Sequence, residues 1–565
     1  MSKKLHAFLL CCLFLISAQT FAQEREVTGK VSDGSGMPIP GVSVYVKGTT
    51  VGTTTDFDGE FSLNVTGEDP VLVFSYIGFQ PKEISVEGQD FFEVTLEDDV
   101  QALEEIVVVG YGVQKRANLT GAVSTVDTEV LEARPITDVA RGLQGTTPGL
   151  TITSPTGQIG TSPKINLRGT IGSLGSSGGA QPLILVDNVE IPNLNYINPQ
   201  DIESISVLKD AASTSIYGAR AAWGVILITT KDGVKNQAPQ VSYSNNFSWA
   251  TPTTMPKVAP AADGAEMALE AMQRTDPNKN DFGIIQMYVD RQSIADMRAW
   301  EEQYGGQDLG LEMVEGRDFY ERGGQLYFIR PWDPMELFLE EWAPQQKHDL
   351  SISGGTDNTT YYLGLGYLTQ QGVYKVNPDT YDRYNFNLDL STDITDWWTT
   401  RASVLHSNSL TTEPFIFSSA TYDPWYYVTR WPAFYPYGTY EGHPFRNHIS
   451  EVEQAKMNEI TSSLSRINLG TTITPIEGLS LNADFTHDRV EGHEHQTGGV
   501  LSAYNFWATG PNLEYGPYSS ASYNRVQYNS SWSRRNTAKA YATYEETLGN
   551  HEFKVTAGGD LEEYE

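Results

Sequence analysis

Histidine and carboxylate side chains, which are common ligands of transition metals, lie close together near residue 490. His487, Glu491, His493 and His495 lie close together, and an extended chain would put His493 and His495 on the same side. Nothing in the stretch marks these side chains as pre-organised by neighbouring groups, as ligands of a bound metal are. We interpret the cluster as part of a solvated outer loop and predict no metal site.

Two other places imitate the start of a calcium-binding loop. Asp56 and Asp58 precede Gly59, but the Glu that should close such a loop is missing, and a tight hairpin turn is favoured. Residues 276–280 also supply Asp and Asn at alternate positions, yet Met287 stands where a closing Glu would be needed. The sequence therefore predicts turns at both places.

Catalytic patterns are equally weak. His448 and Glu451 have the spacing of two zinc-peptidase residues, but they stand in a long predicted loop far from the N-terminal β-rich segment. Residues 175–179 have the spacing of a nucleophile elbow, yet they follow no apolar strand and open no helix. The glycine-rich stretch from Gly172 lacks the Lys-Ser/Thr pair of a phosphate loop. We predict no enzyme activity and no cofactor.

Composition and charge limit the partners of the chain. Its 565 residues carry a formal net charge of −33, which argues against nucleic acid as a partner because phosphate binding needs Lys and Arg. Glycine and tyrosine are abundant, and no long helical pattern dominates. This composition favours a mainly β protein with many turns.

The first 22 residues have the pattern of a secretory signal. Lys3 and Lys4 precede a short apolar run, and Thr20 and Ala22 supply small residues at a cleavage site. Both cysteines of the chain lie inside this segment, so the mature chain is predicted to form no disulfide. No later stretch approaches 18 consecutive apolar residues, so a spanning segment would have to belong to a β-barrel.

Short strand patterns separated by turn residues fill positions 24–98 and predict a small Ig-like β-sandwich. The expected strands are 27–31, 42–46, 61–65, 71–76 and 92–96.

A β-branched run with no obvious neighbouring strand follows at 103–112. It comprises Glu104, Glu105, Ile106, Val107, Val108, Val109 and Gly110. An extended segment of this kind can add to the sheet edge of a partner protein through main-chain hydrogen bonds. One more strand of the sandwich, or a strand of the next domain, is the alternative.

Residues 115–235 predict a mixed α+β domain. Its last part contains a strand near 202–208, a short alanine-rich helix, a glycine turn and a second strand near 225–231.

From residue 238 onward the pattern changes to long two-faced strands. Apolar residues such as Tyr384, Phe386, Leu388 and Leu390 alternate with polar ones. Such alternation is typical of a barrel with lipid outside, although a soluble sandwich can also show it. The connections alternate between brief and long, as in outer-membrane barrels, with only residues 371–380 breaking the contrast, so a transmembrane antiparallel β-barrel is favoured.

The alternation predicts about nine barrel strands, at 241–249, 347–353, 359–369, 381–391, 398–408, 462–474, 478–489, 534–546 and 551–561. Plugged outer-membrane transporters have about 22 strands. We therefore expect positions 238–565 to form only part of a barrel, as a curved sheet wrapped against the preceding domain.

The long connection 410–461 is rich in aromatic residues, including Trp425, Tyr426, Tyr427, Trp431 and Tyr435. Aromatic faces with polar edges suit sugar rings or peptide side chains, so these residues are candidate ligand contacts. Packing within the loop, or an aromatic belt at the membrane interface, explains them equally well.

Several segments of the sequence resemble one family of membrane proteins. The order 29–31, 40–42, 47–49, 55–61 and 75–79 resembles a carboxypeptidase-regulatory-like domain, and 103–112 resembles a TonB box. The phrases 143–150, 165–169, 182–187 and 201–233 resemble a plug domain, and 350–373 resembles an early barrel. Together they resemble the N-terminal part of a SusC/RagA-type TonB-dependent outer-membrane transporter.

The resemblance implies import of an oligomer, more often a glycan than a peptide, together with a SusD-like surface lipoprotein. It also implies that TonB and its inner-membrane energising complex drive the plug, that outer-membrane lipid surrounds the barrel, and that the N-terminal domain lies in the periplasm. A TonB-linked siderophore receptor, a non-transporting adhesin and a secreted carboxypeptidase-like enzyme are the alternatives. An adhesin needs no TonB box, siderophore receptors usually lack the sandwich, and an enzyme needs a zinc or nucleophile set.

Overall fold

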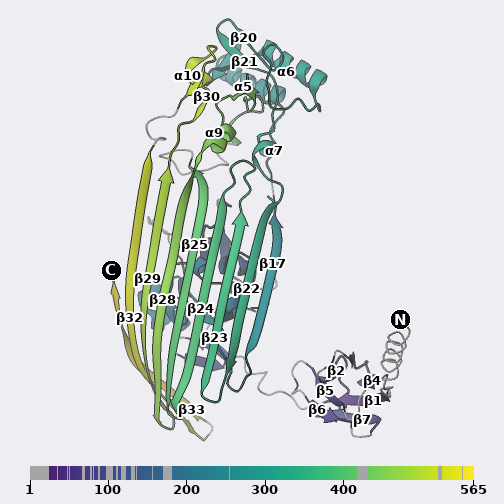
Figure 1. The fold of residues 1–565 in the computed structure, drawn as a ribbon, viewed down its shortest axis with the longest axis vertical. Coiled ribbons are helices and arrows are strands. Elements are labelled where there is room, and N and C mark those ends of the chain that lie inside the picture. Colours follow the sequence, from purple (N-terminus) through teal and green to yellow (C-terminus); the bar gives the residue numbers. More distant parts are fainter. Residues whose placement is uncertain are drawn as a thin grey trace, which may run out of the picture. The chain divides into compact units, whose positions relative to one another are not determined.

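A computed structural model gives the fold as two compact units, residues 1–120 and 121–565, which are described separately (Figure 1). No helix among the described residues is long and apolar enough to cross a membrane. The predicted signal segment and the glycine-rich loop fall outside these residues. The structure describes residues 25–565 except 97–105, 110–111, 116–122, 170–180, 416–428, 519–524 and shorter stretches of one to four residues.

The first unit contains the predicted sandwich, formed by a sheet of order β4-β1-β7 and a sheet of order β3-β2-β5-β6. Alternate residues such as Val27, Val44 and Phe61 point inward, and the Phe61 and Phe74 rings meet edge to face at 5.4 Å. The sequence missed β3 and β6 because they carry few apolar residues. The strands are β1 (Arg25–Ser32), β2 (Ser43–Val46), β3 (Gly52–Thr54), β4 (Glu60–Val65), β5 (Val71–Ser75), β6 (Lys82–Ser85) and β7 (Phe91–Thr95).

The calcium-like residues of this unit form a turn. The Asp56 carboxylate accepts hydrogen bonds from the N–H groups of Asp58 at 3.0 Å and Glu60 at 2.9 Å. Gly59 has a φ of +74°, which favours glycine. The carboxylate oxygen that accepts both bonds is thus used by the turn itself, as an Asx-type turn requires.

The predicted plug domain opens the second unit. Its five-stranded sheet has the order β10-β15-β16-β13-β14, beside a hairpin of β11 and β12. The central β16 opens with four consecutive buried apolar residues, Val225 to Ile228, as expected for a strand covered on both faces. The predicted strand, short helix, glycine turn and strand are β15, α4 with η4, Gly224 and β16. The elements are β10 (Val123–Val126), α3 (Val139–Gly142), β11 (Leu150–Thr153), β12 (Lys164–Leu167), β13 (Leu183–Val186), β14 (Val189–Glu190), η2 (Leu194–Tyr196), η3 (Pro199–Asp201), β15 (Ile202–Leu208), α4 (Ala211–Thr214), η4 (Ser215–Ala221) and β16 (Val225–Thr230).

The predicted barrel strands form one nine-stranded antiparallel sheet, in which neighbours in the chain are neighbours in space. Figure 1 shows this tall sheet curving around the plug. The strands are β17 (Gln240–Ala250), β22 (Ala343–Gly355), β23 (Thr359–Gln371), β24 (Thr380–Thr395), β25 (Trp398–Phe415), β28 (Lys456–Ile476), β29 (Leu479–Thr497), β32 (Val526–Leu548) and β33 (His551–Tyr564).

Several strands run further than predicted at the end that carries the long loops. β28 begins at Lys456 and β32 at Val526, several residues before the predicted starts. In β28 the extra apolar residues, Met457 and Ile460, fall on opposite faces of the strand, and in β32 the apolar row of Val526, Tyr528 and Trp532 is interrupted by Ser530, so the apolar alternation is broken there.

The large sheet is apolar on its outer face and polar on its inner face, which is the reverse of a soluble protein. Outward residues are apolar and exposed, with Tyr384 at 56% and Phe485 at 47% of full exposure. Inward residues are polar and buried, with Arg383 at 1% and Asn387 at 3%. An apolar outer face around a polar, filled interior is the arrangement of a transmembrane barrel wall.

The described parts of the three long connections fold together into a compact structure, which we call the cap (Figure 1). Its core joins aromatic residues from each connection, including Phe328, Phe445 and Phe506. The sequence analysis predicted only loops here and missed the two longest helices. The cap elements are α5 (Ala261–Thr275), β18 (Asp281–Ile284), β19 (Met287–Asp290), α6 (Arg291–Tyr304), β20 (Phe319–Arg322), β21 (Gln325–Phe328), α7 (Pro334–Phe338), β26 (Thr439–Tyr440), β27 (His443–Pro444), α9 (His448–Gln454), β30 (Ser502–Tyr504), α10 (Phe506–Thr509) and β31 (Tyr515–Pro517).

Candidate functional site

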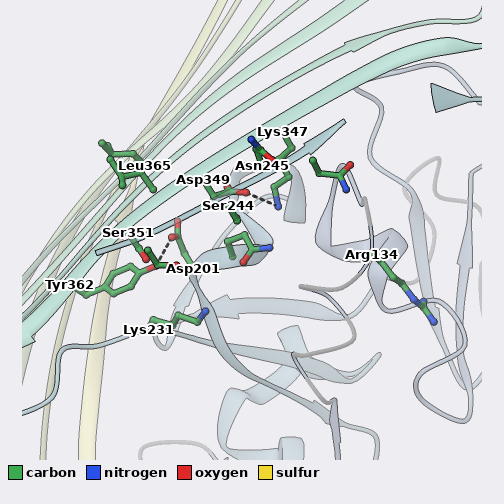
Figure 2. Close-up of a pocket in the computed structure, with 14 residues that line it drawn as sticks. Arg134, Asp201, Lys231, Ser244, Asn245, Lys347, Asp349, Ser351, Tyr362 and Leu365 are labelled. Atoms are coloured by element: carbon green, nitrogen blue, oxygen red, sulfur yellow. Dashed lines mark hydrogen bonds and ion pairs between the residues drawn. The ribbon is translucent and has the colours of Figure 1, made fainter. Parts of the chain in front are cut away.

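The candidate site is the polar interface between the plug and the inner face of the large sheet. A cavity of about 340 Å³ lies in it, between the plug and strands β17, β22 and β23. Figure 2 shows Asp201 and Lys231 of the plug facing Tyr362, Asp349 and Lys347 of the sheet. Opposite charges and hydroxyl groups therefore meet where the plug contacts the sheet.

Two plug side chains make specific contacts at this cavity. Tyr362 donates its hydroxyl hydrogen to Asp201 at 2.8 Å, and the Asn198 amide donates to Asp349 at 2.8 Å. Gly364 and Gly366 of β23 make room for them, since a Cβ at Gly364 would lie 2.2 Å from the Asp201 carboxylate. Glycine at these positions lets the plug backbone approach the sheet closely.

Burial governs the ionisation of Asp201. Loss of solvent raises its pKa to about 6, and the nearby Asp349 carboxylate adds to this, while the Tyr362 hydrogen bond and the Lys231 and Lys347 charges oppose it. A carboxyl group whose pKa is higher in the folded state stabilises that state below its unfolded pKa, and loses this contribution as pH rises through about 6.

We expect the plug around Asp201 to be more protected from amide hydrogen exchange at pH 5 than at pH 7, after correction for intrinsic rates. Asp201→Asn should remove most of this difference, because the amide does not ionise. An equal pH dependence in the variant would assign the effect to another group. Hydrogen exchange of residues 194–208, followed by mass spectrometry in the full-length protein, measures it.

Arg466 is the main link between sheet and plug. Its guanidinium donates to the Asp488 carboxylate at 2.6 and 3.0 Å, and both residues are at least 95% buried. It also donates to the plug carbonyl oxygens of Val186 at 3.2 Å, Val189 at 3.3 Å and Glu190 at 2.7 Å. The planar fork of arginine suits this simultaneous binding of a carboxylate and several carbonyls.

Other inward side chains bind the same plug segment, residues 186–201. Arg383 donates to the Asn195 carbonyl at 2.9 Å, and Asn385 donates to the Tyr196 carbonyl at 3.0 Å. Arg535 donates to the Glu190 carboxylate at 2.9 Å, and Lys539 donates to the Asn188 carbonyl. All of these contacts except the Arg535–Glu190 ion pair hold the segment through its backbone, so their strength depends little on the plug side chains.

These donors were not predicted from the sequence. Arg466 and Arg535 are charged residues at the polar positions of strands in which apolar and polar residues alternate. Such positions point inward in a barrel with a polar lining. Their partners lie about 280 and 345 residues away in the chain, so no local pattern identifies them.

The predicted TonB box falls on a short hairpin of the first unit. Ile106–Val109 forms strand β8, which pairs antiparallel with β9 (Gly112–Lys115). The prediction that this run has no neighbouring strand is therefore wrong: the partner follows two residues later, in a stretch too short and polar to be recognised as a strand. Glu104, Glu105 and Gly110 lie outside the described residues.

The candidate ligand residues of the aromatic loop divide into two groups. Trp431 and Tyr435 lie in the cap core, at 8% and 0% exposure, with their rings stacked at 5.0 Å. Packing accounts for both, which favours the loop-packing alternative. Trp425, Tyr426 and Tyr427 lie outside the described residues, so their contact with a ligand stays a prediction.

Replacing Tyr435 with phenylalanine should loosen the cap by about 1–2 kcal/mol. The Tyr435 hydroxyl donates to the Arg446 carbonyl at 2.7 Å and accepts from the Trp507 indole at 3.1 Å, and both partners would lose a bond. Limited proteolysis of the cap should be faster in this variant. Leu311→Ala, at an exposed cap position, is the control and should cleave like wild type.

The histidines considered as possible metal ligands lie in a strand and contact the neighbouring strand. His487, His493 and His495 lie on β29 and not in an outer loop, so that part of the prediction is wrong. Their rings contact β32: His487 hydrogen-bonds Asn536 at 2.7 Å, and His495 stacks on Tyr528 at 4.2 Å. Among the described residues, no group of three or more His, Cys, Asp or Glu side chains could hold a metal ion.

His448 begins helix α9 of the cap and is 4% exposed. Its ring packs against Phe338, and burial lowers its pKa to about 3. A neutral, enclosed imidazole of this kind is a packing residue and offers no open coordination position.

Comparisons with known proteins bear on both units. A family model for the CarboxypepD_reg-like domain matches residues 27–108, and one for the TonB-dependent receptor plug domain matches residues 115–225. TonB-dependent receptor SusC of Bacteroides thetaiotaomicron is 34% identical over 403 residues, which cover 69% of this chain and 34% of that protein. The chain belongs to the SusC/RagA family of TonB-dependent receptors.

A second curated relative is similar in sequence, and a solved structure is similar in fold. TonB-dependent receptor P39 of Formosa agariphila is 33% identical over 391 residues, covering 69% of this chain and 33% of that protein. The RagAB peptide importer in its open-open state matches the fold with a TM-score of 0.61 at 23% identity, over 81% of this chain and 49% of that one. The SusC/RagA-type chain thus spans about a third of the length of the curated relatives it matches.

Proposed function

We propose that this chain is part of an outer-membrane importer that takes up an oligomeric nutrient in a TonB-dependent manner. The proposal rests on the two faces of the large sheet. Its apolar face points outward, and its polar face binds the plug through groups such as Arg466 and Arg383. Such a wall suits lipid on one side and a removable, hydrated plug on the other. The N-terminal sandwich and the TonB box would then lie in the periplasm.

A polar row on the inner wall supports a glycan ahead of a peptide. At the loop ends of β25, β28, β29 and β32, Asn458 donates to Glu413 and Glu494 at 3.3 Å each, and Asn529 donates to Glu494 at 2.9 Å. Gln158 of the plug donates to Glu413 at 2.6 Å. Carboxylates and carboxamides are suitable partners for sugar hydroxyls. A SusD-like lipoprotein is the proposed surface partner, and TonB the periplasmic one.

Uptake by the full-length protein, expressed with the SusD-like lipoprotein, tests the function. Cells growing on an array of oligosaccharides and peptides as sole carbon source should need both this protein and TonB for growth on at least one oligomer. Growth on every oligomer without the protein would overturn the import function. Requirement for it on peptides alone would overturn the glycan assignment and leave import standing.

A further inference from the structure

Strand β8 has two edges, and among the described residues only one of them is paired, with β9. We propose that the box is presented to TonB as the first strand of the β8–β9 hairpin, and that TonB adds to the opposite edge of β8 as a third strand. This inference rests on the proposed TonB-dependent function. It goes beyond it by assigning a role to residues 112–115, which follow the box.

The register of the hairpin is continuous. Ile106 pairs with Lys115, Val107 with Gln114, Val108 with Val113 and Val109 with Gly112. Two residues, Gly110 and Tyr111, connect the strands in the sequence. A separation of two residues is the commonest one between the strands of an antiparallel hairpin.

The register also decides which main-chain groups are free. In a hairpin with a two-residue connection, the closing pair exchanges both of its hydrogen bonds, and hydrogen-bonded and non-bonded pairs then alternate. The N–H and C=O groups of Val107 and Val109 therefore face β9. Those of Ile106 and Val108 face the outer edge, and this sheet has no third strand among the described residues.

An edge of this kind fits a partner that binds by adding a strand. The main-chain groups of Ile106 and Val108 supply a donor and an acceptor at every second residue, and a neighbouring strand forms its hydrogen bonds with such groups. Holding the box extended before the encounter removes part of the ordering cost that a free peptide would pay on binding. The hairpin would therefore strengthen binding without contacting TonB through β9.

Proline on β9 separates this role from that of the box itself. Gln114→Pro removes the N–H that bonds to Val107 and should open the hairpin, while leaving every residue of the box in place. Binding of the purified TonB C-terminal domain to the full-length protein should weaken roughly tenfold. Val113→Pro is the matched control: its N–H faces away from β8, so the affinity should stay within about twofold of wild type.

A disulfide staple gives a second measurement. Val108 and Val113 form a non-bonded pair, whose short Cα separation suits a disulfide. In the variant with cysteine at both positions, the oxidised form should bind TonB at least as tightly as the same variant after reduction. Loss of binding on oxidation, restored by reductant, would mean that the hairpin must open, which would overturn the inference.

The outcomes also separate this inference from the proposed function. If wild type binds TonB but Gln114→Pro binds equally well or more tightly, the hairpin inference fails and the TonB box assignment stands. If wild type shows no binding to TonB at all, the TonB-dependent function fails with it. Circular dichroism and plug proteolysis of each variant exclude misfolding as the cause.

Discussion

Replacing Val108 with proline should abolish import by the full-length protein while leaving its amount in the outer membrane normal. Val108 occupies the centre of β8, and its N–H faces the edge at which a TonB strand would add. Proline removes that donor, and its ring obstructs the approach of a neighbouring strand. Because strand addition depends on a few adjacent main-chain bonds, loss of one at the centre should interrupt the whole ladder.

Side-chain identity should matter much less at the same position. Val108→Ala keeps the N–H and the extended backbone, so this control should retain most of the uptake. The measurement is the initial uptake rate of a labelled oligomer, normalised to the receptor detected at the cell surface. Undiminished import by Val108→Pro would remove residues 104–110 from the proposed role of TonB box.

The sequence predicted the strands of the large sheet well because each carries its own evidence. Outward residues such as Leu390 and Phe485 are apolar, and the pleat makes them alternate with polar residues. Strand ends were placed less well, since the alternation is broken at the added ends of β28 and β32, by Ile460 on the face opposite Met457 and by Ser530 between Tyr528 and Trp532. Local periodicity therefore locates the middle of each strand more accurately than its ends.

The cap and the plug contacts could not be predicted in the same way. Phe445 is completely buried only because Phe328 and Phe506 arrive from two other connections of the chain. In the sequence it is one aromatic residue in a long loop. Likewise, an arginine in an alternating strand indicates an inward position, but the carbonyl groups that it binds depend on the plug backbone. Tertiary partners far apart in the sequence decide both cases.

Replacing Arg466 with alanine should release the plug segment 186–201 from the wall. The change leaves the buried Asp488 without its main partner and removes donors from three plug carbonyls. Breaking a buried ion pair from one side costs about 3–5 kcal/mol, because the remaining charge stays desolvated. That loss is a large fraction of the stability of a domain, so the plug should leave its closed position often enough to leak.

Permeability and amide exchange measure this release. Cells carrying the full-length Arg466→Ala protein should become sensitive to a large antibiotic such as vancomycin, and residues 183–201 should exchange faster. Arg489→Ala is the control: its partner Glu491 lies on the outer face, and the Arg489 side chain is 56% exposed, so little should change. The double change Arg466→Met with Asp488→Leu should restore part of the anchorage, since it removes the stranded charge. Equal leakage in the double and single variants would mean that the carbonyl contacts, and not the ion pair, hold the plug.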